Sequence, residues 1–277
     1  MPELPEVETI VRGLREKLRD LEFSKVEVGL GKCISGSKKS FRASLRGRKI
    51  LGVERRGKNI IFHLSGGVVL LVHLRMTGRL RFVPAHTPPE KHTHVIFSFQ
   101  DHPCQLRFAD QRQFGRICVE KKAGDQLSSL AALGPEPFEM SAEEFTHRAR
   151  EKRRSIKPLL LDQGFLAGVG NIYVDEALHR ARIHPRRPAD SLEGKALLSL
   201  YYALRCILRQ AIRAGGTSVR SYVDASGSMG GFQYSLQVYG REGKACRFCG
   251  DSIVRERVAG RSSFFCRRCQ PERRKKE

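Results

Sequence analysis

Apolar residues recur at helical spacing near the start of the chain. Between Val7 and Leu21 an apolar residue returns every three or four positions, which is the period that places side chains on one face of a helix. Pro5 suits the first turn of this helix, because the backbone N–H groups there have no partner within the helix. The pattern therefore predicts that the chain opens with a helix.

Short runs rich in β-branched and aromatic residues follow between about residue 25 and residue 120. Such residues favour strands, and glycine and other turn residues separate one strand from the next. This part of the chain is predicted to form a β-sandwich or a β-barrel. The clearest strands are Asn59–Leu64, Val68–Leu74, Val95–Phe99 and Gln105–Ala109.

The periodicity changes after the turn residues at Leu133–Pro137. Helical spacing then continues through Ile156–Asp162, Ile172–Ala181 and Leu197–Ile212, so a mostly helical second domain is expected. Gly215 and Gly216 should end the last helix. The segment 224–231 is expected to be a mobile loop, because it is too polar and too rich in glycine to pack. The charged tail from residue 271 onward is expected to be disordered.

The chain is strongly basic. Its 277 residues include 51 Lys and Arg against 29 Asp and Glu, which gives a formal net charge of +22. A field of that sign attracts polyanions, so nucleic acid is the leading partner. A basic but functionally neutral surface would have the same composition, and charge therefore indicates a class of partner and not a reaction.

No apolar stretch approaches the length of a membrane span, and the N-terminus lacks the features of a signal peptide. A cytosolic location without membrane contact is therefore expected, and a reducing cytosol argues against disulfides. Four of the eight cysteines stand alone and are expected to be small buried apolar residues. These four are Cys33, Cys104, Cys118 and Cys206.

The other four cysteines form a metal-binding pattern. Cys246 and Cys249 are one C-x2-C pair, Cys266 and Cys269 are another, and sixteen residues separate the pairs. This spacing is typical of a tetrahedral structural Zn²⁺ with four thiolate ligands and no open position for catalysis. Residues 241–277 also contain twelve Lys or Arg against five acids, so the finger is suited to bind phosphates.

Several motifs occur together along nearly the whole chain. They are residues 2–9 (PELPEVET), His73-Leu74 with Met76-x-Gly78, Asp110-x-Arg112-x-Phe114-Gly115, Leu133–Pro137, Asp162-Gln163 with residues 168–173 (GVGNIY), and the cysteine pairs. With these motifs the chain resembles the formamidopyrimidine-DNA glycosylase family, also called 8-oxoguanine DNA glycosylase. The resemblance implies an α+β multidomain protein with a two-layer β-sandwich and flanking helices at residues 1–133. A helix-two-turns-helix domain at 134–225 and a lesion-capping loop with a zinc-finger β-hairpin at 226–277 would follow.

The resemblance also implies catalytic roles. Removal of Met1 would expose the secondary amine of Pro2, and an α-amine with a pKa of about 8 is far more often neutral at pH 7 than a lysine with a pKa of about 10.4. Pro2 is therefore expected to be the nucleophile. Glu3 resembles the family's general acid, and Glu6 a supporting carboxylate. Lys58 resembles the family lysine that handles DNA and protons during elimination. Arg261 resembles the finger arginine that binds the phosphates flanking the lesion and is assigned to the second elimination step.

Further residues match DNA contacts of the family. An enzyme acting on a stacked base must extrude it and fill the gap, and the filling residues would be Met76, Arg112 and Phe114. The implied backbone contacts are His92, Lys152, Lys157, Asn171 and Tyr173. Three departures from the family pattern concern lesion preference: Arg75 replaces a frequent glycine, Gln113 replaces a basic residue, and residues 228–232 (SMGGF) replace a Lys-Pro-Gly-Tyr-Phe type of loop.

The function that the resemblance implies is excision of oxidised purines from duplex DNA by a monomer, followed by cleavage of the strand at the abasic site. One structural Zn²⁺ and no redox cofactor are expected. Two alternatives remain. One is the sister family, endonuclease VIII, which prefers oxidised pyrimidines, although Leu4 and the Arg112-x-Phe114 motif argue against it. The other is a zinc-ribbon DNA-binding protein without catalysis.

Overall fold

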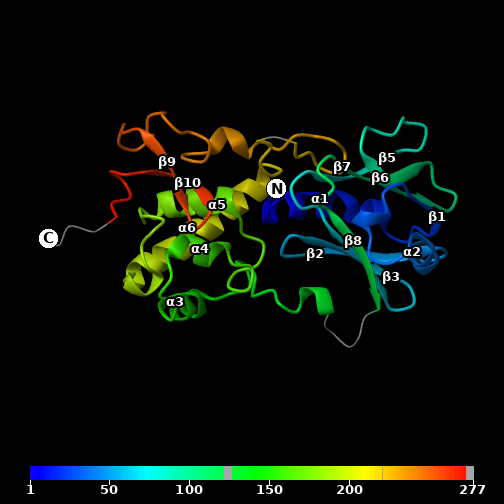
Figure 1. The fold of residues 1–277 in the computed structure, drawn as a ribbon, viewed down its shortest axis with the longest axis horizontal. Coiled ribbons are helices and arrows are strands. Elements are labelled where there is room, and N and C mark those ends of the chain that lie inside the picture. Colours follow the sequence, from blue (N-terminus) through cyan, green and yellow to red (C-terminus); the bar gives the residue numbers. More distant parts are fainter. Residues whose placement is uncertain (122–126, 220, 273–277) are drawn as a thin grey trace. The chain divides into compact units, whose positions relative to one another are not determined.

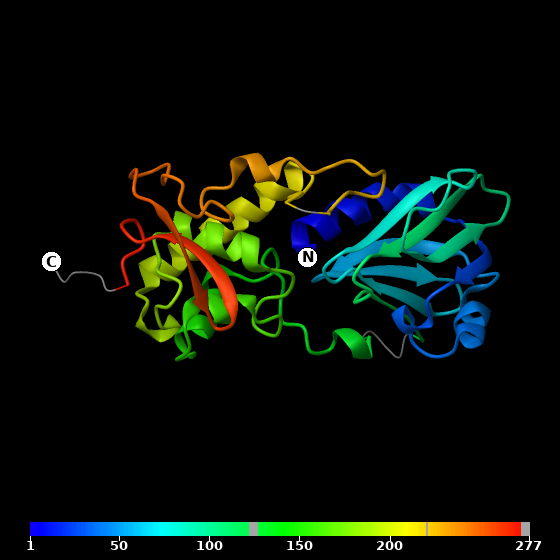
Figure 2. The same ribbon diagram turned by 45° about the horizontal axis from the view of Figure 1, so that its top comes forward.

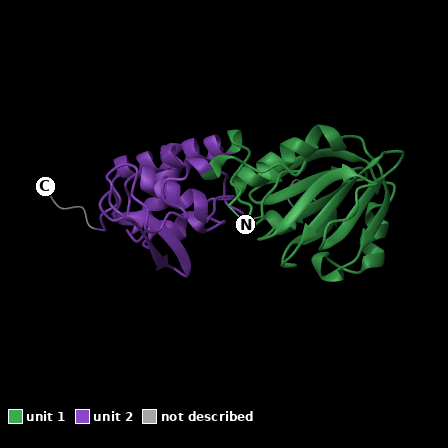
Figure 3. Ribbon diagram, turned by 90° about the horizontal axis from the view of Figure 1, so that it is seen from above, with its two compact units in different colours: residues 1–131, 212–233 green, residues 132–211, 234–277 purple. Residues whose placement is uncertain are grey.

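The chain folds into two compact units. The computed structural model describes residues 1–121, 127–219 and 221–272. The first unit consists of Met1–Ala131 and Ile212–Gln233, and the second of Ala132–Ala211 and Tyr234–Glu277 (Figure 3). The chain thus leaves the first unit, forms the helices of the second, and returns to the first before it enters the zinc finger. This return is not evident from the periodicity of the sequence.

The first unit contains two antiparallel four-stranded sheets (Figures 1 and 2). Apolar side chains of both sheets, among them Phe62 and Phe97, belong to one buried core. The fold is therefore a β-sandwich, as the resemblance implies. One sheet has the order β1 (Phe23–Val28), β6 (Thr93–Phe99), β7 (Cys104–Asp110), β5 (Gly78–Pro84), and the other β2 (Ile50–Arg56), β3 (Asn59–Leu64), β4 (Val68–His73), β8 (Arg116–Lys121).

Helix α1 (Leu4–Leu18) is the predicted N-terminal helix, and it packs against β2. Its apolar face, including Val7, Ile10 and Leu14, is completely buried in the core of the sandwich. The helix ends before Leu21, because Asp20 adopts a positive φ of 62° that turns the chain toward β1. A second helix, α2 (Lys38–Leu45), and a short 3-10 helix at Gly31–Cys33 were not predicted.

The second unit contains helices α3 (Ala142–Arg150), α4 (Ile156–Leu161), α5 (Asn171–Arg180) and α6 (Gly194–Arg213). The last three correspond to the helical runs predicted from the sequence, and the final residues of α6 belong to the first unit. Strands β9 (Ile253–Val258) and β10 (Arg261–Cys266) form the antiparallel hairpin of the finger. Short 3-10 helices lie at Ser128–Leu130, Ala189–Ser191 and Phe232–Ser235.

The loop at residues 224–231 is packed, so the expectation that it is too polar to pack was wrong. Its Asp224 carboxylate accepts hydrogen bonds from the backbone N–H groups of Ser226 and Ser228. Ala225 is buried in the core of the sandwich. Gly230 lies so close to Gly216 that a Cβ atom there would be 2.3 Å from the Gly216 carbonyl oxygen. The glycines permit close packing here, and the predicted mobility stays a prediction.

All eight cysteines are free thiols in the structure. Cys33 is buried as expected, but Cys104, Cys118 and Cys206 are only half-buried, so the expectation of burial was wrong for these three. The predicted disordered tail falls mainly on residues 273–277, which lie outside the described residues. Within the described ranges, no helix combines the length and the apolar composition needed to cross a membrane.

Candidate active site, DNA-contacting side chains and metal centre

Pro2 and Glu3 lie at the start of α1. Both residues are buried, and Glu3 is the N-cap of the helix. The backbone N–H of Glu3 donates to Glu6 Oε2 at 2.7 Å, which closes a capping box. The helix therefore holds the backbone beside Pro2 in a defined conformation.

Glu6 joins this N-terminus to the segment that returns after α6. Its Oε1 accepts a hydrogen bond from the backbone N–H of Thr217 at 2.8 Å, and the Tyr222 hydroxyl donates to the Glu6 carbonyl oxygen at 3.3 Å. Gly216, with φ of 85°, passes so close that a Cβ atom would lie 3.0 Å from Glu6 Oε1. Burial raises the pKa of Tyr222, so its hydroxyl stays protonated and able to donate. Sequence reasoning missed Thr217 and Tyr222, because nothing local signals a partner some 211 residues away.

Lys58 follows Gly57 in the tight turn between β2 and β3. Its side chain is only 7% exposed, whereas a lysine in a turn is usually solvated. Arg55 connects this turn to α1, because it donates to the Gly57 carbonyl at 3.1 Å and to Glu8 Oε2 at 2.9 Å. The turn that carries Lys58 is thus tied to the helix that carries Pro2 and Glu3.

His73 is a half-buried residue whose charge environment includes Lys58. Burial and, to a smaller extent, the charges of Arg75 and Lys58 together lower the pKa of His73 to about 4. The imidazole is therefore neutral at pH 7, and its Nδ1 accepts a hydrogen bond from the backbone N–H of Arg75 at 3.0 Å. His73 belongs to one of the motifs of the resemblance, without an expected role of its own.

The three predicted gap-filling side chains lie together at two loop tips. Met76 and Phe114 are 39% and 47% exposed, unusually high values for large apolar residues. The Arg112 guanidinium contacts Met76 Sδ at 3.0 Å and lies 4.8 Å from the centre of the Phe114 ring. The structure therefore brings Met76, Arg112 and Phe114 into one exposed cluster.

Asp110 and Thr77 stabilise the two loops that carry this cluster through hydrogen bonds. The buried Asp110 carboxylate accepts hydrogen bonds from Thr77 Oγ1 at 2.5 Å and from the backbone N–H of Gly115 at 2.7 Å. Thr77 Oγ1 in turn accepts the backbone N–H of Arg112 at 3.0 Å. Because Thr77 follows Met76 directly, one hydroxyl joins both loop tips. This role of Thr77 was not predicted from the sequence.

His92 lies close to the same loops. Its backbone carbonyl accepts a hydrogen bond from the N–H of Asp110 at 3.0 Å, and its ring lies 6.4 Å from that of His94. The side chain is half-buried. His92 is therefore near the gap-filling cluster, as a residue that contacts DNA beside the lesion would be.

In the second unit, two residues predicted to contact DNA are in the interior. Lys157 and Tyr173 are both completely buried. Lys157 Nζ donates to Asp175 Oδ1 at 2.6 Å and to the carbonyl oxygen of Ser262 at 2.9 Å. The Lys157 ammonium group is therefore engaged inside the second unit, and the DNA contacts expected of Lys157 and Tyr173 stay predictions.

Asn171 and Lys157 converge on the residue next to Arg261. The Asn171 side-chain amide also donates to the Ser262 carbonyl, at 2.9 Å. Two donors therefore hold the backbone at the start of β10, where Arg261 is exposed. Lys152 is exposed as well. The exposed side chains of Lys152 and Arg261 are thus accessible to DNA. Lys157 instead stabilises the hairpin through its hydrogen bond to the Ser262 carbonyl.

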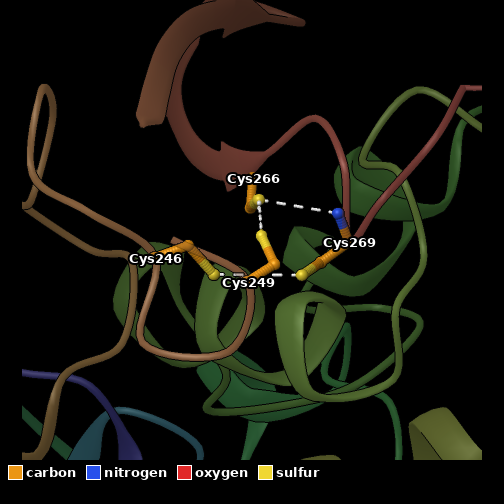
Figure 4. A group of neighbouring side chains, drawn as sticks. All are labelled: Cys246, Cys249, Cys266 and Cys269. Atoms are coloured by element: carbon orange, nitrogen blue, oxygen red, sulfur yellow. Dashed lines mark hydrogen bonds between the residues drawn. The ribbon is translucent and has the colours of Figure 1, made fainter. Parts of the chain in front are cut away.

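The four cysteines of the finger form a compact group (Figure 4). Their sulfur atoms all lie within 4.8 Å of one another, with Cys249 and Cys266 at 3.4 Å and Cys246 and Cys269 at 3.8 Å. A tetrahedral Zn²⁺ with bonds of about 2.3 Å to sulfur requires sulfur atoms about 3.8 Å apart. The donor set and its spacing therefore fit one structural Zn²⁺.

The structure thus combines a β-sandwich whose first helix starts beside Pro2 and Glu3, a helical domain and a four-cysteine finger. Comparison with protein families agrees along the chain. Residues 1–117 match the formamidopyrimidine-DNA glycosylase N-terminal domain, residues 133–223 match the H2TH domain of the same enzymes, and residues 243–271 match the zinc finger found in FPG and IleRS. The chain belongs to the formamidopyrimidine-DNA glycosylase family, whose members are bifunctional enzymes.

Relatives and solved structures support the same assignment. The formamidopyrimidine-DNA glycosylase of Pelotomaculum thermopropionicum is 50% identical over 274 residues, covering 98% of this chain and 99% of the relative. That of Heliobacterium modesticaldum is 47% identical, covering 98% and 100%. Wild-type Lactococcus lactis Fpg, in a crystal structure with DNA containing N7-benzyl-Fapy-dG, is 36% identical with a TM-score of 0.89, covering 98% and 100%. A complex of the same enzyme with abasic-site DNA has a TM-score of 0.87 at 35% identity, covering 97% and 99%.

Proposed function

We propose that this enzyme excises oxidised purines from duplex DNA and cleaves the resulting abasic strand, with the amine of mature Pro2 as the nucleophile. The observation that carries the proposal is the buried start of α1, where Pro2 and Glu3 are adjacent. There the Glu6 carboxylate accepts hydrogen bonds from the backbone N–H groups of Glu3 and Thr217. Lactococcus lactis Fpg, crystallised with DNA containing N7-benzyl-Fapy-dG and with abasic-site DNA, supports the substrate class. The enzyme would act as a monomer on the DNA of the nucleoid in the cytosol.

The first step takes the damaged nucleotide out of the stack. Met76, Arg112 and Phe114 enter the duplex at the vacated position, since an extruded nucleotide leaves a gap that apolar and cationic groups can fill. The neutral amine of Pro2 then attacks C1′, and the bond between C1′ and the base nitrogen breaks. The electron pair of that bond leaves with the base, which takes up a proton.

Opening of the sugar follows. Glu3 protonates the ring oxygen as the bond between C1′ and that oxygen breaks, and the Pro2 nitrogen lone pair forms an iminium with C1′. Loss of a C2′ proton then expels the 3′ phosphate, and a second elimination expels the 5′ phosphate. Lys58 and Arg261 assist these proton transfers and hold the flanking phosphates. The product is a one-nucleotide gap with phosphates at both ends.

Borohydride trapping tests this mechanism. The iminium is reducible, so borohydride should link the wild-type protein covalently to DNA that contains 8-oxoguanine. Retention of Met1 blocks the amine and should abolish trapping while duplex binding persists. Glu3→Gln should bind the lesion but fail to release the base, because it keeps the shape and loses the proton.

Mass mapping of the trapped complex identifies the attacking residue. Attachment at the N-terminal peptide is expected. Attachment at Lys58 or at any other internal residue would overturn the mechanism and leave the glycosylase class intact. Excision rates on a panel of oxidised purines and pyrimidines then establish the lesion preference. Arg75, Gln113 and the loop at 228–232 depart from the family pattern and are expected to influence this preference.

A further inference from the structure

Helix α5 presents a row of polar side chains to the zinc finger. The row begins at Asn171, which contacts the Ser262 carbonyl, and it continues with Asp175, which accepts the backbone N–H of Phe264 at 3.0 Å. Glu176 then accepts three backbone N–H groups, those of residues 237, 238 and 239, at 2.9 Å each. Asp175 and Glu176 are buried. The finger is therefore built on one face of α5, and not only around its metal site.

His179 is the last member of this row, and the mechanism above does not use it. Its side chain is 1% exposed, and its Nε2 lies 3.5 Å from Cys246 Sγ. Among the described residues, its buried Nδ1 has no hydrogen-bond partner. Phe248 covers the imidazole from outside, with ring centres 5.3 Å apart. The ring is thus enclosed and directed at one of the four predicted zinc ligands.

The chemistry of the pair decides the direction of the contact. A zinc-bound cysteine is a thiolate, which accepts hydrogen bonds and has no proton to donate. A neutral imidazole carries one N–H, and the arrangement with the proton on Nε2 directs that donor at the thiolate. With the proton on Nδ1, a nitrogen lone pair would face the sulfur and an unpaired N–H would be buried. That form therefore has a higher free energy than the form with the proton on Nε2.

We propose that His179 is a positioning residue of the metal centre: its Nε2–H donates to the Cys246 thiolate, which fixes the first cysteine knuckle on α5 and retains the Zn²⁺. The hydrogen bond stabilises the negative charge of the sulfur and occupies one of its lone pairs. The thiolate is then less readily protonated or attacked by electrophiles, and both reactions release the metal. Groups of this kind around metal ligands typically change metal affinity by about 10- to 100-fold.

Two substitutions separate the hydrogen bond from the packing. His179→Phe keeps a flat ring and removes the donor, whereas His179→Gln replaces the ring with an amide N–H at a similar distance from the backbone. Transfer of Zn²⁺ from the full-length protein to an excess of a coloured chelator is measured for each. His179→Phe should lose zinc at least about 10-fold faster than the wild type, and His179→Gln should stay near the wild-type rate. Equal rates of zinc release from the wild type and from His179→Phe would overturn the proposal. It would also be overturned if His179→Gln released zinc as fast as His179→Phe.

Phe248→Ala is the matched control, because it removes the ring that covers His179 and keeps the donor. It should release zinc at close to the wild-type rate.

A measurement on the wild type keeps the proposal testable if His179→Phe fails to fold. The proposal requires that the His179 imidazole carry its proton on Nε2. Nitrogen NMR of the zinc-loaded protein with labelled histidine distinguishes the two neutral forms of the ring. The form with the proton on Nε2 is expected for His179, and the form with the proton on Nδ1 would contradict the proposal.

Discussion

Replacement of Lys157 by methionine tests whether this residue supports the fold or contacts DNA. Methionine fills most of the same volume but removes the ammonium group. Asp175 then keeps the backbone N–H of Phe264 as a donor and loses the ammonium at 2.6 Å. The Ser262 carbonyl loses one of its two donors, Lys157, and keeps Asn171.

The expected loss of stability is large because both members of the pair are buried, at 0% and 1% side-chain exposure. Removing one partner of a buried ion pair typically costs about 3–5 kcal/mol, since the remaining carboxyl group must stay buried as an unpaired charge or take up a proton. For a unit of this size the loss corresponds to a decrease in Tm of roughly 10–20 °C. Lys157→Met should therefore unfold the second unit at a clearly lower temperature than the wild type.

The loss should also depend on pH. Burial raises the pKa of Asp175 to about 7 even though Lys157 lowers it, and without the ammonium the pKa rises further. A carboxyl group with a raised folded-state pKa contributes stability at low pH that disappears as the pH rises through that pKa. The difference between the variant and the wild type should therefore be smaller at about pH 6 than at about pH 8.5.

Thermal unfolding at both pH values and duplex binding at several salt concentrations form the assay. Arg261→Ala is the matched control, because Arg261 is exposed and should contact phosphate. It should leave Tm unchanged and flatten the salt dependence of binding by about one unit. The double variant Lys157→Met/Asp175→Leu should recover part of the lost stability, since no charge stays unpaired. If Lys157→Met kept the wild-type Tm and flattened the salt slope as Arg261→Ala does, the structural role would be refuted.

Two further predictions concern the gap-filling loops and the metal. Thr77→Val removes two hydrogen bonds worth about 1 kcal/mol each, so single-turnover excision should slow by roughly 30-fold, whereas Thr77→Ser should stay near the wild-type rate. A fluorescent base opposite the lesion reports the insertion of the gap-filling side chains directly. An unchanged fluorescence signal and an unchanged excision rate in Thr77→Val would contradict the role of Thr77 in fixing the two loops. Cys249→Ser should purify without zinc and lose duplex binding while the first unit stays folded. Metal analysis, a binding assay and circular dichroism check these three outcomes. A variant that retains one zinc and binds duplex normally would contradict the prediction that Cys249 is a zinc ligand needed for binding.

The sequence alone determined those features that depend on local spacing. The 3.6-residue period predicted the helix at the N-terminus and three helices of the second unit, because a helix places every third or fourth side chain on one face. The strand runs were recognisable for the same reason, with a period of two or a continuous apolar run. The cysteine pairs specified the metal centre through the short distance that each C-x2-C turn spans. The resemblance rested on motifs of this local kind.

Tertiary structure alone decided which charged and polar side chains are buried, and against what. Lys157 matches a DNA contact in the resemblance, yet it packs against Asp175 and Ser262 inside the second unit. Glu6 and Thr217 meet across 211 positions, and His179 and Cys246 across 67. Such contacts leave no periodic trace in the sequence, because burial depends on how distant segments pack and not on the neighbours of a residue along the chain.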